Sequence, residues 1–174
     1  MLRLLLLRHS KAVPFAGSGD HERALTERGR ADAARLGAFI AAEKIAPQAA
    51  IHSGARRTEE TLAIVLRKLQ PGVVVSSEPR LYEATRSAFL SVVRDGADAA
   101  KTRLLVGHNP SIGETASHLA TTGDRRALSA MAVKFPTSAL AVIDFGGDRW
   151  SEIEAAAGRL VHFATPAGLG DADK

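Results

Sequence analysis

The segment Leu4-Leu5-Leu6-Leu7-Arg8-His9-Ser10-Lys11 decides the fold, because a short apolar run ends there abruptly at an arginine and a histidine. A run of this length, bounded by polar residues, predicts a strand that is buried on both faces. In open α/β sheets, ligands bind beyond the carboxyl ends of the strands. Arg8 and His9 are therefore expected beside a ligand crevice, where a cation and an imidazole suit an anion site with a nucleophile. Taken alone, the stretch also fits a solvated arginine and a hydrogen-bonded loop histidine.

Composition places the chain among globular proteins of one domain. It has 174 residues, of which 45% are hydrophobic, and it contains no cysteine, which excludes disulfides and thiolate metal sites. We expect a single domain over residues 1–167 and a frayed tail over residues 168–174. The net charge of +4 favours anionic partners. Because the charges are mixed along the chain, nucleic acid is not expected to be among those partners.

The apolar N-terminus does not predict a targeting segment. The leucine run is too short for the hydrophobic part of a signal peptide, and no small-residue cleavage site follows it. No segment reaches the length of a transmembrane helix. The expectation is a soluble, cytoplasmic protein without membrane association.

Hydrophobic periodicity predicts strands that alternate with helices along the chain. The expected strands are Leu4–Leu7, Ala49–His52, Val73–Val75, Arg103–Gly107 and Ala139–Phe145, with Arg149–Ile153 and Arg159–Phe163 as additional edge strands. The expected helices are one capped by Thr26, one around Leu62–Leu69, one over Ser87–Arg94, and one with Asn109 as N-cap and Pro110 as its first residue. This alternation predicts an α/β protein, a three-layer α/β/α arrangement around a mostly parallel sheet.

Three of the predicted strand-to-helix junctions carry polar groups that suit a phosphoryl ligand. The first has Arg8 and His9, the second has Ser53, Arg56, Arg57 and Thr61, and the third has Gly107-His108-Asn109-Pro110. Because such junctions share one edge of a parallel sheet, these side chains are expected to converge. Arginines bind phosphoryl oxygens bidentately, and the start of the helix after Asn109 adds a positive dipole end.

These junctions resemble the motifs of a known family. Leu7-Arg8-His9-Ser10 resembles the Arg-His-Gly motif of the histidine phosphatase superfamily, also called phosphoglycerate mutase-like, and Ser53 to Thr61 resembles its Ser-Pro-x-x-Arg-x-x-x-Thr motif. Val106 to Pro110 resembles the second histidine motif. Within the superfamily, Leu25-Thr26-Glu27-Arg28-Gly29 and Lys134-Phe135-Pro136-Thr137-Ser138 are similar to the SixA-type phosphohistidine phosphatases. The resemblance spans Leu4 to about Pro166 and implies a phosphoglycerate mutase-like fold.

The resemblance assigns catalytic roles residue by residue. It implies that His9 is the nucleophile that becomes phosphorylated, that Arg8 and Arg57 bind the phosphoryl group, and that His108 is the second histidine of that pocket. Arg56 is the alternative to Arg57, since a shift of one position would exchange them. Asn109 is expected to bind phosphate beside them.

Two residues depart from the family motifs. Ser10 replaces the usual glycine, which predicts a turn that is tighter on the substrate. Gly54 replaces proline, which predicts a looser entry to the following helix. Neither replacement removes a catalytic group.

The general acid is left open between Glu83 and Asp20. Glu83 lies where many family members carry a carboxylate, and an exposed loop carboxylate without a role is the alternative reading. The resemblance implies no metal and no cofactor, and the sequence holds no comparable cluster of ligands.

The sequence therefore predicts a metal-independent phosphatase with a phosphohistidine intermediate, acting as a monomer. Only about 25 residues separate Arg57 from Glu83, and about 25 more separate Glu83 from His108, which leaves no room for a long lid. An open site suits a phosphorylated protein, so a SixA-type protein phosphohistidine phosphatase is expected. The alternatives are a phosphatase or mutase for small phosphate esters and a non-catalytic module that binds phosphoproteins.

Overall fold

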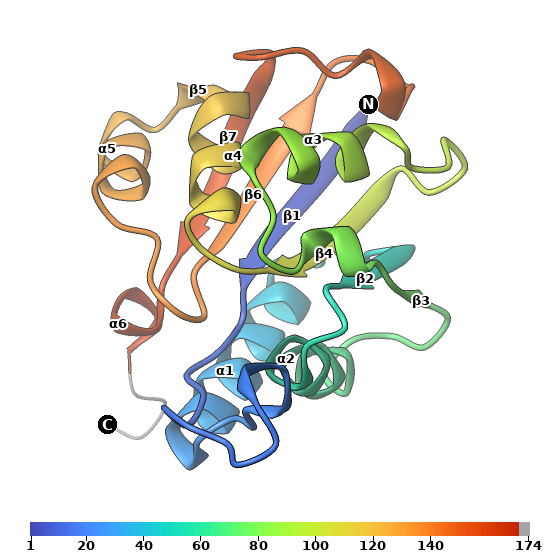
Figure 1. Ribbon diagram of the computed structural model, residues 1–174. Coiled ribbons are helices and arrows are strands. Elements are labelled where there is room, and N and C mark those ends of the chain that lie inside the picture. Colours follow the sequence, from blue (N-terminus) through green and yellow to red (C-terminus); the bar gives the residue numbers. More distant parts are fainter. Residues whose placement is uncertain (171–174) are drawn as a thin grey trace.

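A central sheet organises the chain, whose computed structural model describes residues 1–170 (Figure 1). Within these residues, seven strands form one sheet in the order β3-β2-β4-β1-β6-β7-β5. The strands are β1 (Leu2–Arg8), β2 (Ala49–His52), β3 (Val74–Ser77), β4 (Thr102–Gly107), β5 (Ala120–Gly123), β6 (Leu140–Phe145) and β7 (Gly158–Ala164). Of these strands, β6 alone runs antiparallel to its neighbours β1 and β7. The predicted mostly parallel α/β sheet is confirmed.

Helices cover both faces of the sheet. They are α1 (Glu27–Ala42), α2 (Arg56–Leu66), α3 (Arg86–Arg94), α4 (Ser111–Leu119), α5 (Arg125–Val133) and the short α6 (Pro166–Leu169). Helices α1 and α2 lie on one face and α3 and α4 on the other, as Figure 1 shows. Among the described residues, no helix is both long and apolar enough to cross a membrane.

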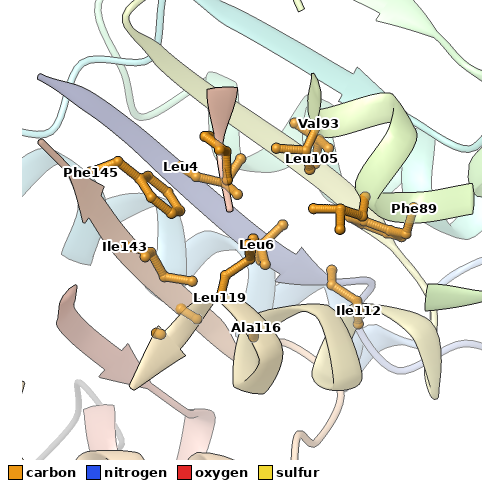
Figure 2. Packing of buried hydrophobic residues seen from close by; sticks show 14 of the residues in the cluster. Leu4, Leu6, Phe89, Val93, Leu105, Ile112, Ala116, Leu119, Ile143 and Phe145 are labelled. Atoms are coloured by element: carbon orange, nitrogen blue, oxygen red, sulfur yellow. The ribbon is translucent and has the colours of Figure 1, made fainter. Parts of the chain in front are cut away.

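The leucine run of β1 is apolar at every position because both of its faces are covered. Leu4 and Leu6 pack with Phe89 of α3 and Ile112 of α4 in one core cluster (Figure 2). The intervening Leu5 and Leu7 belong to the second cluster, which includes Leu36 of α1 and Val65 of α2. Successive side chains of a strand point to opposite faces, so an uninterrupted apolar run is what a doubly covered strand requires.

The registers of β1, β4 and β2 bring the polar junctions together. Arg8 pairs with Gly107 across β1 and β4, so His9 and His108 leave the sheet side by side. His52 of β2 pairs with Val106 of β4, which places the Ser53 junction next to them. Because these three strands are parallel, all three chains leave the same edge.

The predicted elements differ from the observed ones mainly in the C-terminal half. The expected strand over Arg149–Ile153 is wrong, since Trp150–Glu152 forms a 3₁₀ helix. The expected edge strand over Arg159–Phe163 exists as β7, but it lies inside the sheet because β5 pairs with it on its outer side. Strand β5 and helix α5 were not predicted.

The cap predicted for α4 is also wrong. Pro110 occupies the N-cap position, and the side chain of Asn109 donates instead to the carbonyl oxygen of Phe135 at 2.8 Å. By contrast, Thr26 caps α1 as predicted, accepting from the amide of Gly29. In the expected tail, Gly168 and Leu169 lie in α6, while residues 171–174 lie outside the described residues.

Candidate active site

A cavity of about 330 Å³ opens where β1 and β4 end. Its lining includes both histidines of the junctions, together with four cationic side chains and two carboxylates. The lining residues are Arg8, His9, Lys11, Ala12, Asp20, Arg23, Arg57, Tyr82, Glu83, His108, Asn109 and Thr137. The cavity therefore contains every side chain that the sequence assigned to the reaction.

A hydrogen bond assigns the protonation of His9. The ring lies at the end of β1, only 8% exposed, and its Nδ1 is 2.7 Å from the carbonyl oxygen of Ser10. Since a carbonyl oxygen can only accept, Nδ1 carries the hydrogen when the ring is neutral. The other nitrogen, Nε2, then holds a lone pair and has the electronic state that a nucleophile needs.

The surroundings keep His9 neutral at physiological pH. Its pKa is lowered to about 4, chiefly because burial disfavours the charged ring and further because Arg57 and Arg8 are nearby like charges. The hydrogen bond from Nδ1 to the Ser10 carbonyl acts in the opposite direction but does not outweigh burial.

His108 faces His9 and is held by a short chain of hydroxyl groups. The two ring centroids are 5.1 Å apart, and Nε2 of His108 lies 2.7 Å from Oγ of Ser53. The hydroxyl of Thr58 donates to the Ala55 carbonyl and lies 3.0 Å from Oγ of Ser53. The hydroxyl of Ser53 then donates to Thr58, so Ser53 accepts from Nε2–H of His108 and leaves Nδ1 of that ring unprotonated. Burial and the neighbouring His9 lower the pKa of His108 to about 3.

The two predicted arginines enter the cavity from different elements. Arg8 ends β1 and donates through Nη1 to the Phe135 carbonyl at 3.0 Å. Arg57 is in the first turn of α2 and donates through Nη1 and Nη2 to the backbone oxygen and a carboxylate oxygen of Asp20, at 2.8 and 3.1 Å. The Nε atoms of both guanidiniums are buried and have no hydrogen-bond partner among the described residues.

Arg56 does not line the cavity. Its side chain is half exposed and pairs with Glu60 at 2.9 Å along α2. Of the two candidate arginines, only Arg57 lines the cavity.

The two candidate acids both reach the cavity but differ in environment. Asp20 accepts from Tyr82 at 2.6 Å and from Arg23 at 2.8 Å, besides Arg57, and these hydrogen bonds hold its pKa well below the usual range. Asp20 is therefore ionised at neutral pH and is a poor proton donor. Glu83 is exposed, with its backbone in the left-handed region at φ 51°, and its carboxylate has no ion-pair partner in the described range.

Several lining residues were not singled out from the sequence. Tyr82 links Asp20 to His108, since its hydroxyl donates to Asp20 and its ring packs nearly perpendicular to the His108 ring, with the centroids 5.5 Å apart. It is the only tyrosine of the chain and adjoins Glu83, which is the signal that could have marked it. Lys11 lies two positions after His9, and Thr137 lies within the Lys134 to Ser138 segment.

The two departures from the family motifs have structural roles that the sequence did not reveal. Ser10 does not tighten the cavity, because its hydroxyl is fully buried 2.6 Å from the hydroxyl of Ser138. Gly54 adopts φ +86°, a left-handed conformation that proline cannot take and that glycine adopts freely.

Comparisons with known proteins agree with this geometry. The sequence model of a protein family, the histidine phosphatase superfamily (branch 1), matches residues 4–89. A solved structure described as a candidate phosphohistidine phosphatase SixA from Agrobacterium tumefaciens is 29% identical, with a TM-score of 0.80, over 95% of this chain and 98% of that one. A similar candidate from Nakamurella multipartitia is 26% identical, with a TM-score of 0.79, over 95% and 96% of the two chains.

A relative is also found by sequence comparison. An uncharacterised protein of Mycobacterium tuberculosis is 31% identical over 92% of this chain and 99% of its own length. The structural matches also include a phosphoglycerate mutase from Plasmodium falciparum, 17% identical with a TM-score of 0.57 over 92% of this chain and 89% of that one, which shows a shared fold. The predicted phosphoglycerate mutase-like fold is thereby confirmed.

Proposed function

This chain belongs to the histidine phosphatase superfamily, and we propose that it is a metal-independent phosphatase that removes phosphoryl groups from phosphohistidine in proteins. The observation that carries the proposal is the state of His9. Its Nε2 is unprotonated at neutral pH, and His9 lines a cavity together with two arginines, Arg8 and Arg57. Guanidinium groups are always charged and bind phosphoryl oxygens through charge-assisted hydrogen bonds, so the two arginines suit a phosphoryl group bound beside His9.

In the first step, Nε2 of His9 attacks phosphorus. The bond from Nε2 to phosphorus forms while the bond from phosphorus to the substrate nitrogen breaks, and its electron pair leaves with the imidazole. Arg8 and Arg57 hold the equatorial oxygens, where most of the charge lies during phosphoryl transfer. Nδ1 of His108 can take up a proton when the phosphoryl dianion binds, since a neighbouring negative charge raises the pKa of an imidazole.

Glu83 is the better candidate for the group that protonates the leaving nitrogen. Asp20 accepts hydrogen bonds from a tyrosine and two arginines, so protonating it would disrupt that network. Glu83 lines the same cavity without such partners. After the leaving group departs, water attacks the phosphohistidine, the bond between phosphorus and Nε2 breaks, and inorganic phosphate is released.

The shape of the site favours a phosphoryl group that another protein presents. The chain between Arg57 and His108 is occupied by α2, β3 and α3 with short connections, so no long segment in this interval can fold over the cavity. An imidazole also leaves more readily than an alkoxide, so phosphohistidine depends less on a strong acid. We accordingly propose that Glu83, although exposed, is sufficient as the proton donor.

A substrate panel tests this function. We expect higher kcat/KM for a phosphohistidine peptide than for 3-phosphoglycerate or sugar phosphates, and loss of all turnover in a folded His9→Ala variant. A preference for small esters of tenfold or more, about 1.4 kcal/mol in the transition state, would instead favour an ester phosphatase. Stoichiometric binding of the peptide without turnover by the unaltered protein would favour a binding module.

A further inference from the structure

We call the cavity that His9 and His108 line the phosphoryl cavity. A second cavity of about 480 Å³ adjoins it and shares two lining residues with it, Lys11 and Thr137. We call it the flanking groove. It lies between the start of α1, the end of α5 and the chain around α6, and it has no part in the reaction described above. Its lining residues are Lys11, Arg28, Asp32, Ala130, Lys134, Pro136, Thr137, Phe163, Thr165, Pro166 and Ala167.

Lys11 is held in place between the two cavities. Its carbonyl oxygen accepts from the amide of Thr26 at 2.9 Å and from the hydroxyl of the same residue at 3.1 Å. The first turn of α1 is packed so tightly on it that a Cβ at Gly29 would lie 2.1 Å from that oxygen. The lysine side chain therefore starts from a rigid backbone and lines both spaces.

The segment from Phe135 to Ser138, which forms another wall of the flanking groove, is hydrogen-bonded to residues of the phosphoryl cavity. The Phe135 carbonyl accepts from Arg8 and from Asn109, and the amide of Ser138 donates to the backbone oxygens of Arg8 and His9. Pro136 and Thr137 lie between these anchor points. A molecule that occupies both cavities would thus contact walls with a fixed relative position.

The charge of the flanking groove is positive at its rim. Lys11 and Lys134 are exposed, and neither ammonium group has an ion-pair partner within residues 1–170. Arg28 is mostly exposed and lies 3.9 Å from Asp32. The carboxylate of Asp32 is itself buried and bonded to Arg35, so it does not present a free negative charge to a ligand.

The remaining lining is mostly apolar, with Phe163, Pro136, Pro166, Ala130 and Ala167. A surface that combines apolar side chains with unpaired cations complements an apolar segment that carries a carboxylate. Because the flanking groove adjoins the phosphoryl cavity and shares Lys11 and Thr137 with it, a polypeptide whose phosphorylated residue is bound there can place its neighbouring residues on this surface.

We propose that the flanking groove binds the residues next to the phosphorylated side chain of a protein substrate and selects those with one apolar and one acidic side chain. This inference rests on the proposed function and adds a substrate preference to it. Lys11 and Lys134 provide the charge complementarity, and the wall formed by Phe163 and the prolines covers the apolar side chain.

Matched peptides and matched variants test the proposal. Two phosphohistidine peptides carry leucine and either aspartate or asparagine within a few residues of the phosphorylated position. Each kcat/KM is divided by the value of the same protein for free phosphohistidine, which removes effects on the chemistry. We expect the aspartate peptide to be preferred by about threefold to tenfold, since solvent-exposed ion pairs are individually weak.

Lys134→Glu should abolish or reverse this preference, because it replaces an attracting charge with a repelling one. Lys68→Glu makes the same change in a separate cavity that shares no lining residue with the flanking groove, and it should leave the preference intact. Binding of the unphosphorylated peptides, measured by fluorescence polarisation, should favour the aspartate peptide in the unaltered protein and in Lys68→Glu, and should lose or reverse that preference in Lys134→Glu.

The outcomes separate this inference from the proposed function. Turnover of both phosphohistidine peptides with equal normalised kcat/KM, or a preference that survives Lys134→Glu, would overturn the flanking-groove proposal alone. No turnover of any phosphohistidine substrate, with selective binding of the aspartate peptide that Lys134→Glu removes, would overturn the proposed function and retain the flanking groove.

Discussion

One hydrogen bond decides which nitrogen of His9 can react. The Ser10 carbonyl accepts from Nδ1 and so leaves Nε2 with its lone pair, while burial prevents the ring from taking up a second proton near neutral pH. At His108, the hydroxyl of Ser53 accepts from Nε2 and so leaves Nδ1 with the lone pair. The two rings thus remain neutral in a cavity that is otherwise rich in fixed positive charge.

The titration of His9 follows from this environment. Because its pKa in the folded protein is about 4, below the ordinary value of 6.5, we expect His9 to remain neutral as the pH falls through 6.5 and to gain a proton only near pH 4. An NMR titration of the ring measures this directly. Arg57→Ala removes a like charge and admits water, so it should raise the pKa of His9. A midpoint at or above 6.5 in the unaltered protein would contradict the assignment.

Two adjacent arginines allow a sharp test of the phosphoryl-binding group. Loss of a charged donor to the reacting group commonly costs on the order of 10²–10³ in rate, and we expect this for Arg57→Ala. Arg56→Ala removes an exposed pair with Glu60 and should change the rate little. Steady-state kinetics on the two variants compares them. Equal losses, or a larger loss for Arg56→Ala, would contradict the placement of Arg57.

At the scale of elements, the site lies at the ends of parallel strands, and the first turn of α1 holds the backbone of Lys11 at its edge. The first turn of α1 contacts the backbone of Lys11 so closely that only glycine fits at position 29. The same contact brings the amide and hydroxyl of Thr26 onto the Lys11 carbonyl. The segment Leu25 to Gly29 thus has a structural role next to the cavity.

Gly29→Ala tests this packing. In an exposed helix interior, alanine is more favourable than glycine by about 1 kcal/mol. Here the added Cβ would overlap a backbone oxygen, so we expect destabilisation of about 1–3 kcal/mol and a lower kcat/KM as the Lys11 segment shifts. Thermal unfolding and kinetics report the two effects. Gly146→Ala, at a position with nothing within 4 Å, is the control. A rise in Tm for Gly29→Ala would contradict the packing argument.

The elements that sequence patterns predicted correctly are those with a strong periodic signal. The leucine run of β1 is buried on both faces and α1 buries one apolar stripe, and the positions of β2 and β4 followed from similar apolar runs. Helix α5 was missed because Met131 is its one fully buried residue, so no stripe is visible. Strand β5 follows α4 directly, and Ala120 continues the helical spacing although it begins a strand.

Individual side-chain partners were harder to predict than the site itself. The motif residues His9, Arg8, Arg57 and His108 could be placed at one edge because the strand-to-helix junctions of a parallel sheet share that edge, and the family resemblance identified them. The Tyr82 contact with Asp20 joins residues 62 positions apart, and nothing local in the sequence specifies it. Asparagine often caps helices, but the side-chain amide of Asn109 instead donates to the distant carbonyl oxygen of Phe135.

At the scale of the whole molecule, two helical layers bury the sheet and leave its carboxyl edge for chemistry. The phosphoryl cavity opens at that edge, and the flanking groove lies beside it, next to α5 and α6. The rest of the molecule supplies a rigid support, since β1 is buried on both faces along its length. Such an arrangement fits a phosphatase that meets its substrate as part of another protein.

The central claim is that Nε2 of His9 becomes phosphorylated during turnover. Rapid quench with ³²P-labelled substrate, followed by digestion and peptide mapping, measures it most directly. We expect label on the peptide that contains His9, lost in acid and retained in base, and no label in a folded His9→Ala variant. Label on another residue, or full turnover by His9→Ala, would contradict the account.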